Sequence, residues 1–223
     1  FRMYTPISPP QSQPSDGTSA ERSPVPKNGP QTWWVWECPP QPAAVNMAWD
    51  EALLIGMPIL GRPVLRLYGW TEPAASFGYF QRYADVAAAT SLRPLVRRPT
   101  GGGLVPHAAD WTYALVLPAG HEWYRLRAET SYQRLHTWLQ TAFGLLGLTT
   151  TLANEARRSR PGCCFEGHER HDLLWHGRKI AGAAQRRTRH GLLIQGSVQP
   201  PVAGWSRPAW HQALLTAAEK LWN

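Results

Sequence analysis

The chain has 223 residues, of which 43% are hydrophobic, and its formal net charge is +8. This length fits one large domain or at most two small ones, and the apolar fraction is that of a globular protein with a buried core. The three cysteines, Cys38, Cys163 and Cys164, exclude a disulfide framework because their number is odd and two are adjacent.

The positive charge indicates a partner with an acidic surface, which a nucleic acid, an acidic protein domain or a phosphate-bearing ligand would offer. Arginine pairs at 97–98, 157–158 and 186–187 are scattered rather than gathered in one block, which argues against nucleic acid. No apolar stretch approaches the length of a membrane span, and the cysteine usage suits a reducing compartment. We therefore expect a cytoplasmic protein with no nucleic-acid partner, no membrane partner and no metal site.

Residues 1–32 are rich in Pro, Ser, Gln and Gly with almost no apolar clusters, which predicts a disordered segment. Residues 33–223 are predicted to form a single domain, beginning with a short aromatic strand at 33–36. Further strands are predicted at residues 64–68, 75–78, 111–117, 172–176, 179–185 and 192–198, and further helices at 83–90, 128–146 and 210–222.

Asn46 is predicted to cap an amphipathic helix over residues 47–54, because its side chain can accept from the first free backbone N–H groups. The strands at 172–176 and 179–185 are predicted to form a hairpin with a tight turn at Gly177. Strands and helices follow one another without a regular βαβ alternation. This order favours an α+β fold with a mixed, largely antiparallel sheet flanked by helices.

One segment combines two cations, three glycines and a histidine: Arg97, Arg98, Gly101, Gly102, Gly103 and His107. Consecutive glycines let the backbone approach a ligand and leave N–H groups facing an anion, and guanidinium groups suit carboxylates and phosphates. The spacing matches neither a Walker loop nor a dinucleotide fingerprint. A glycine-rich hairpin without a ligand is the alternative interpretation.

Two further residues are candidates for chemistry. Lys179 lies in a run of small residues and would neutralise a carboxylate or acyl-phosphate, which makes the carbonyl more electrophilic. Cys164 would act as a nucleophile if nearby cationic side chains favour its thiolate. The alternatives are a solvated strand lysine and a small buried thiol.

These motifs together resemble the biotin/lipoate protein ligase superfamily, in its lipoate–protein ligase and octanoyltransferase branch. Four segments in the family's order carry the resemblance: NMAWDEALL from Asn46, SFGYFQ from Ser76, RRPTGGG from Arg97 with His107 and Asp110, and GRKIAG from Gly177 with QGS ending at Ser197. They cover nearly all of the chain after residue 33.

The resemblance implies the catalytic-domain fold of that superfamily, with a mixed sheet flanked by helices. It implies that an acyl chain lies in an apolar tunnel and ends as an amide on a lysine of an acidic lipoyl domain, with Lys179 contacting the acyl carbonyl. The substrate- and adenylate-binding residues that it implies are Arg66, Ser76, Gly78, Arg97, Arg98, Gly101, Gly102, Gly103, His107, Asp110, Ala181, Gly182 and Ser197.

Two activation routes exist within the family. A ligase activates free lipoate with ATP and magnesium through an acyl-adenylate, and the unbroken glycine run resembles the ligases. An octanoyltransferase takes octanoate from acyl carrier protein through a cysteine thioester and needs no cofactor; Cys164, fifteen residues before Lys179, resembles the cysteine of one such branch. The ligase is the leading expectation, although Ala108 follows His107 where an aspartate is common.

The ligase expectation has one further consequence. No sequence after Asn223 is present to form the accessory domain of many ligases, so a separate accessory subunit would supply it. Outside the family, the alternatives are a biotin ligase, a non-catalytic homologue and a basic nucleic-acid-binding module. The glycine run lacks the arginine-rich pattern of biotin ligases, and the arginines flank glycines rather than one aromatic face.

Overall fold

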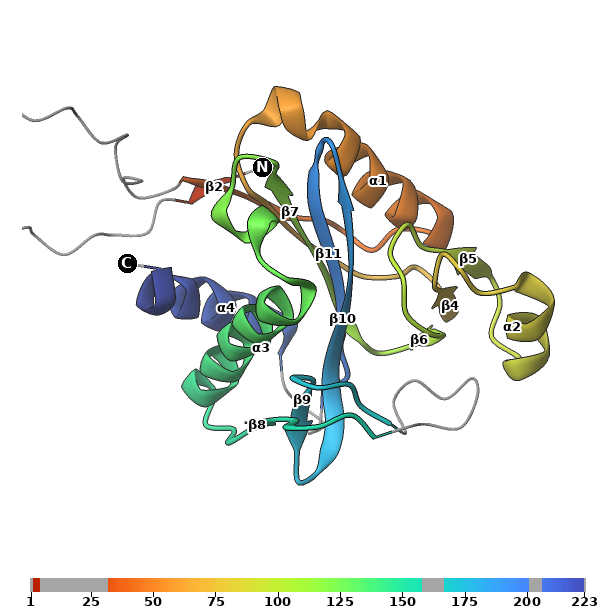
Figure 1. Ribbon diagram of the computed structural model, residues 1–223. Helices are drawn as coiled ribbons and strands as arrows, with labels where there is room; N and C mark the ends of the chain where they lie inside the picture. The colour runs from red at the N-terminus through yellow and green to blue at the C-terminus, as the bar shows by residue number, and fades with distance from the viewer. Residues whose placement is uncertain (1, 5–31, 158–166, 201–205, 223) are drawn as a thin grey trace, which may run out of the picture.

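The computed structural model describes residues 2–4, 32–157, 167–200 and 206–222, and its centre is an eight-stranded sheet (Figure 1). Neighbouring strands run antiparallel except β2 and β3, which are parallel. The mixed, largely antiparallel α+β fold predicted from the sequence is therefore confirmed. In spatial order the strands are β1 (Arg2–Tyr4), β2 (Trp33–Glu37), β3 (Val64–Tyr68), β7 (Trp111–Pro118), β11 (Gly191–Val198), β10 (Arg178–Thr188), β9 (Leu173–Trp175) and β8 (Thr151–Leu152).

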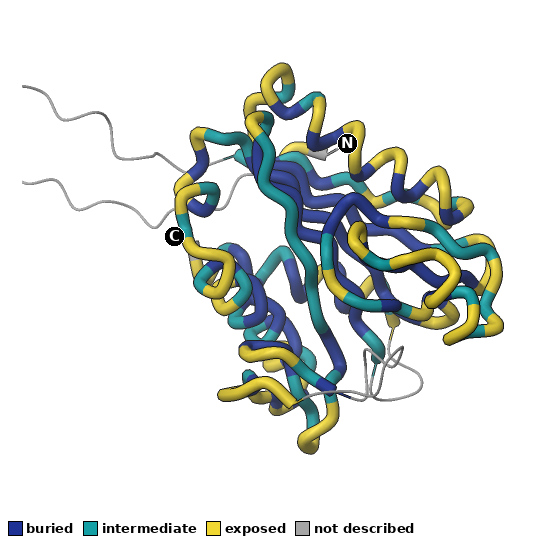
Figure 2. The backbone as a smooth tube through the Cα atoms, turned by 45° about the vertical axis from the view of Figure 1, so that its right-hand side comes forward, coloured by how far each residue is buried: buried dark blue, intermediate teal, exposed yellow. Residues whose placement is uncertain are grey.

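The central strands are buried on both faces, as Figure 2 shows for the interior of the sheet. Side chains alternate along a strand, so β7 sends Tyr113, Leu115 and Leu117 to one face and Ala114 and Val116 to the other. Helices α3 (Ala128–Leu145) and α4 (Arg207–Trp222) pack on the first face, and α1 (Ala43–Leu60) packs on the second.

A second, three-stranded sheet lies beside α1 on the second face. It has the order β5 (Leu95–Arg97), β4 (Ala74–Phe77) and β6 (Val105–His107), and helix α2 (Tyr83–Ala89) packs beside it. A 3-10 helix spans Glu122–Arg125. The sequence predicted one sheet; the small sheet is an addition, and it carries the glycine segment between β5 and β6.

The predicted cap at Asn46 is wrong. Helix α1 begins at Ala43, four residues before the predicted start at Met47. The residue before the helix is Pro42, and no side chain caps this end. Asn46 is fully buried inside the helix, where its amide donates to the backbone oxygens of Gln41 and Gly69. Its hydrogen-bonding groups are used for tertiary contacts, which explains why it does not cap.

Two other expectations change. Residues 2–4 form β1, paired with β2, although the whole segment 1–32 was expected to be disordered.

Helix α1 has 18 residues and a mean hydropathy of 1.2, so by length and composition it is apolar enough to cross a membrane. The expectation that no apolar stretch approaches this length is therefore wrong for α1.

Candidate functional site

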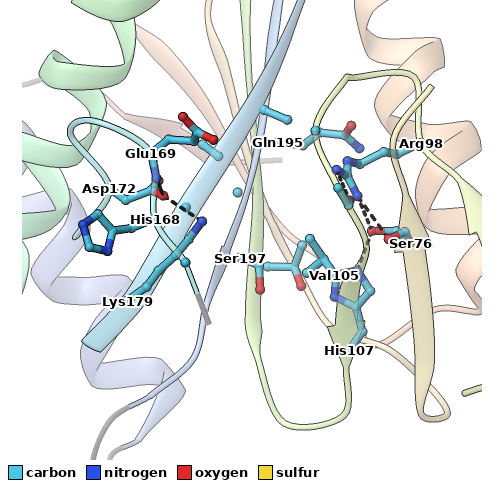
Figure 3. A pocket seen from close by; sticks show the side chains of 18 of the residues that line it. Ser76, Arg98, Val105, His107, His168, Glu169, Asp172, Lys179, Gln195 and Ser197 are labelled. Carbon is cyan, nitrogen blue, oxygen red and sulfur yellow. Dashed lines mark hydrogen bonds and ion pairs between the residues drawn. The ribbon is translucent and has the colours of Figure 1, made fainter. Parts of the chain in front are cut away.

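A cavity of about 260 Å³ lies between the large sheet and the three-stranded sheet (Figure 3). Its lining includes side chains from β10 and β11 on one side and from β4, β6 and the glycine segment on the other. Eight of the residues predicted for the site line it: Ser76, Arg98, Gly102, Gly103, His107, Lys179, Gly182 and Ser197.

Lys179 occupies one wall of this cavity. Its Nζ lies 2.7 Å from Asp172 Oδ2, and both side chains are nearly buried. The backbone N–H of Glu169 donates to the same carboxylate oxygen at 2.7 Å, so the position of Asp172 is set from two directions. A cation held in this way at a cavity wall can face a carbonyl or carboxylate oxygen of a ligand.

A β-bulge aims Lys179 into the cavity. The register between β10 and β9 shifts between Lys179 and Ala181, so the strand carries one extra residue there. Ile180 and Ala181 turn into the main core, whereas Lys179 lies over Gly182. A Cβ at Gly182 would lie 2.7 Å from Lys179 Nζ, so a side chain at this position would displace the end of the lysine.

The opposite wall carries a chain of buried polar side chains. Ser76 Oγ lies 2.8 Å from His107 Nε2, and His107 Nδ1 lies 2.8 Å from Asp110 Oδ2. The hydroxyl groups of Thr112 and Ser197 donate to the same oxygen of Asp110, at 3.0 and 2.7 Å. Asp110 therefore orients His107 from behind rather than lining the cavity itself.

Trp70 completes this wall. Its indole ring stacks on the His107 imidazole with centroids 3.8 Å apart and an interplanar angle of 19°. The indole N–H donates to Thr112 Oγ1 at 2.8 Å, which links the ring to the same polar group. The imidazole is thus fixed in its plane as well as along its hydrogen bonds.

Arg98 lines the cavity, but its hydrogen bonds go to the protein. Its Nη1 donates to the carbonyl and hydroxyl oxygens of Ser76, at 3.1 and 3.2 Å. Its Nε and Nη2 donate to the carbonyl of Gly101, and Nη2 also donates to the carbonyl of Gly103, at 2.6 Å. These bonds match the five N–H donors of a guanidinium, so Arg98 shapes the glycine segment.

A second buried network ties the glycine segment to the sheet. Thr100 Oγ1 donates to Gln195 Oε1 at 2.7 Å, and Gln195 Nε2 donates to Asp50 Oδ2 at 2.7 Å. Tyr68 also donates to Asp50, and burial together with the Asp50 charge raises the pKa of Tyr68, which keeps its hydroxyl a donor. Gln195 lines the cavity and thereby joins the loop, the sheet and α1.

Six of the predicted site residues lie outside the cavity lining, Asp110 among them. Arg66 is fully buried and its Nη1 lies 2.6 Å from Asp50 Oδ1. Arg97 is exposed and donates to the backbone oxygens of Tyr79 and Gln81. Of the remaining three, Gly78 packs against the backbone of Gly101 and Gly102, the Gly101 carbonyl accepts from Arg98, and Ala181 belongs to the main core.

Cys164 lies outside the described residues. The two ends of its segment are described, however, and both line the cavity. They are paired by hydrogen bonds from Arg157 N to His168 O and from His168 N to Arg157 O, at 2.7 and 3.0 Å.

In the part of the chain that the structure describes, no group of three or more His, Cys, Asp or Glu side chains is placed to hold a metal ion.

Sequence reasoning missed Asp172, Gln195 and Trp70. Asp172 stands at the start of the predicted hairpin, opposite the small-residue run, and pairing the hairpin strands would have brought it near Lys179. Gln195 lies two residues before Ser197, which was predicted for the site, so the strand alternation that the two share was the available signal. Nothing in the local sequence indicates the stacking of Trp70.

This fold, with a lysine and a glycine segment facing one cavity, is that of protein–lysine acylating catalytic domains. Residues 42–200 match the family model of the lipoyl protein ligase A/B catalytic domain. The chain belongs to this family, and the resemblance stated from the sequence is confirmed.

Two curated relatives carry the name octanoyltransferase LipM. The one from Oceanobacillus iheyensis is 36% identical over 178 residues, which cover 75% of this chain and 64% of the relative. The one from Geobacillus kaustophilus is 34% identical over 175 residues, with 72% and 62% covered. The chain thus spans slightly less than two thirds of the length of these relatives.

Solved structures show the same fold. A lipoate–protein ligase A bound with ATP superposes with a TM-score of 0.65 at 19% identity, covering 85% of this chain and 84% of the other. A bipartite lipoate protein ligase from Thermoplasma acidophilum, described with its E2 lipoyl domain, gives a TM-score of 0.58 at 16% identity, with 85% and 83% covered.

Proposed function

We propose that this chain transfers an octanoyl group from a thioester donor to a lysine of an acceptor protein. The observation that carries the proposal is the Lys179–Asp172 pair at the cavity wall, in a chain whose relatives at 32–36% identity are named octanoyltransferase. Relatives at this identity weigh more than ligase structures at 19% or less, which support the fold alone. Residues 33–223 would form the catalytic domain.

In the proposed first step, the Cys164 thiolate attacks the carbonyl carbon of the donor thioester. The carbon–sulfur bond of the donor breaks, its thiol leaves with a proton, and the acyl group becomes a thioester on Cys164. Lys179, held by Asp172, donates a hydrogen bond to the carbonyl oxygen and stabilises the negative charge that develops there.

In the second step, the neutral amine of the acceptor lysine attacks the Cys164 thioester. An amide bond forms, the carbon–sulfur bond breaks, and the sulfur takes the proton that the amine loses. Lys179 serves the same oxygen in both steps, because both pass through a tetrahedral intermediate on the same carbonyl. Arg157, at one end of the Cys164 segment, would add positive potential near the thiolate.

The remaining lining suits the acyl chain. Met47, Val105, Ala183 and Ala184 provide apolar contacts beside the polar groups. A linear acyl chain buried against them loses contact with water, which favours binding by about 0.8 kcal/mol per buried methylene. The net charge of +8 favours an acidic acceptor domain and an acidic acyl carrier protein as partners.

A lipoate–protein ligase is the second candidate. The unbroken run Gly101–Gly103 favours it, since backbone N–H groups without side chains suit the phosphate of an adenylate. Arg98 lines the cavity and would keep a positive charge beside such a site, although its N–H groups donate to protein oxygens, whereas Arg97 lies outside the lining. This route would use ATP and magnesium, and a separate accessory subunit as in a bipartite ligase.

Intact-mass spectrometry of the protein in two separate reactions tests the proposal. One reaction supplies octanoyl-acyl carrier protein, and the transferase predicts an octanoyl adduct that Cys164→Ser changes to a hydroxylamine-resistant form or abolishes. The other supplies ATP, magnesium and lipoate with pyrophosphate monitored. Pyrophosphate release without an adduct in the first reaction would select the ligase instead.

A further inference from the structure

Ser76, His107 and Asp110 form a hydrogen-bonded line whose distances, 2.8 Å at both links, are those of a serine nucleophile, its base and the orienting acid. The pairing register of β4 and β6 brings Ser76 and His107 together. Antiparallel pairing of β4 and β6 sets Ala74 opposite His107, so Ser76 and His107 are diagonal neighbours on one face. Asp110 follows in the turn before β7.

The hydrogen bonds assign the direction of the protons. Asp110 accepts through Oδ2, so His107 carries its proton on Nδ1 and presents Nε2 as an acceptor to the Ser76 hydroxyl. Thr112 and Ser197 donate to the same carboxylate oxygen, so Asp110 Oδ2 is held in place from three sides. His107 is therefore set to receive the Ser76 proton and to share the resulting charge with Asp110.

Arg98 adds a charge at the oxygen that would become negative. Its Nη1 lies 3.2 Å from Ser76 Oγ, close enough to stabilise an alkoxide. The hydroxyl is not needed to hold the arginine, because the carbonyls of Ser76, Gly101 and Gly103 already accept from it.

We propose that Ser76 is a second acyl-accepting nucleophile of this cavity, and that with His107 and Asp110 it hydrolyses acyl esters and thioesters. Ser76 Oγ attacks the acyl carbonyl carbon as its proton passes to His107 Nε2. The bond to the leaving alcohol or thiol breaks, and His107 returns the proton to the leaving group. Water then attacks the acyl-serine, His107 takes its proton, and the carboxylic acid and the Ser76 hydroxyl are released.

This activity goes beyond lysine acylation, because it needs neither an acceptor lysine nor Cys164. Figure 3 shows Ser76, Arg98 and His107 on one side of the cavity and Lys179 and Asp172 on the other, with Gln195 and Ser197 between them. One bound acyl group would thus lie between two walls. An acyl group that is not transferred to the acceptor lysine would be hydrolysed at Ser76 and released as the free acid.

The test uses the full chain carrying Cys164→Ala, which removes the thiol as a nucleophile. The protein is treated with an alkyl fluorophosphonate, the labelled peptide is identified by mass spectrometry, and p-nitrophenyl octanoate hydrolysis is followed. We expect the label on Ser76 and a hydrolysis rate that falls by about 100-fold or more in Ser76→Ala and Asp110→Asn. Ser206→Ala, at an exposed serine outside the cavity, is the control and should keep the parent rate.

Folding of each variant is checked by circular dichroism and Tm. Native protein in which Ser76 stays unlabelled, or a folded Ser76→Ala that hydrolyses the ester at the parent rate, would overturn the proposal. If a variant fails to fold, the presence or absence of the label on Ser76 in the parent chain still tests the proposal. Because no lysine acceptor or acyl carrier protein is present, failure here is separate from failure of the transferase assay.

Discussion

Lys179 and Gly182 lie on the same side of β10, although three residues apart in a regular strand they would point to opposite faces. The bulge between Lys179 and Ala181 supplies the extra residue that reverses the alternation. The glycine then leaves room for the lysine, whose Cε and Nζ pass 2.6 and 2.7 Å from the position of a Cβ at residue 182. The orientation of the proposed catalytic cation thus depends on a backbone irregularity and a missing side chain.

Gly182→Ala should lower acyl transfer by about 100-fold, because the added methyl group displaces the end of Lys179 by the order of 1 Å. The lysine end is flexible, so we expect the free energy of unfolding to change by less than about 1 kcal/mol. The measurements are kcat/KM for transfer and a urea titration. Gly56→Ala is the control: nothing lies within 4 Å of its Cβ, so activity should be unchanged and α1 slightly stabilised. Equal activity in the two variants would contradict the assigned geometry.

Arg66→Met should destabilise the fold by about 3 kcal/mol or more, since it leaves the buried Asp50 carboxylate without its cation. Arg134→Met is the matched control. Its partner Glu122 lies at the same 2.6 Å distance, but both side chains are about half exposed, so the loss should stay below about 1 kcal/mol. Urea unfolding of both variants measures the two losses in free energy of unfolding. Losses of similar size would show that the buried Arg66–Asp50 pair matters no more to stability than an exposed pair.

Thr100→Val should remove the hydroxyl that joins the glycine segment to Gln195 while keeping the side-chain shape. Leaving the Gln195 oxygen buried without this donor costs about 1–3 kcal/mol, and the loosened segment should lower kcat/KM for acyl transfer. Thr141→Val serves for comparison, because that hydroxyl bonds only within its own helix. A Thr100 variant with the activity and stability of the Thr141 variant would show that the segment is held by other contacts.

Acidification should weaken the fold between about pH 6.5 and pH 4. Burial lowers the pKa of His136 to about 4, with Asp172 opposing and Lys179 adding to this shift. The unfolded chain takes up a proton on this histidine below about pH 6.5 and the folded chain does not, so stability is full above that pH and falls until pH 4. Urea titrations across this range should give a smaller decline for His136→Leu than for the parent. Parallel declines would contradict the assignment.

The sequence predicted the elements of the site better than their orientation. The hairpin around Gly177 and the strand at β11 follow from alternation and turn chemistry, and both are confirmed. The bulge that turns Lys179 into the cavity has no local signal, because it depends on how β10 is paired on both sides.

The cationic residues show the same limit. Arg98 was predicted to bind a ligand, since an arginine before a glycine run suits an anion; it lines the cavity, and it also satisfies the carbonyls that this run exposes. Arg66, also predicted to bind the substrate, lies outside the cavity lining in a buried network with Asn46 and Asp50. Polar residue types identify a site, but their partners are set by packing between elements distant in sequence.

The most direct test of the central claim is the intact mass of a lipoyl-domain acceptor incubated with octanoyl-acyl carrier protein and either the parent chain or Lys179→Ala. We expect octanoylation of the acceptor lysine by the parent and by Lys220→Ala, an exposed lysine at the end of α4, and none above background by a Lys179→Ala protein that circular dichroism shows to be folded. A folded Lys179→Ala that octanoylates the acceptor at the parent rate would contradict the role assigned to Lys179 in this cavity.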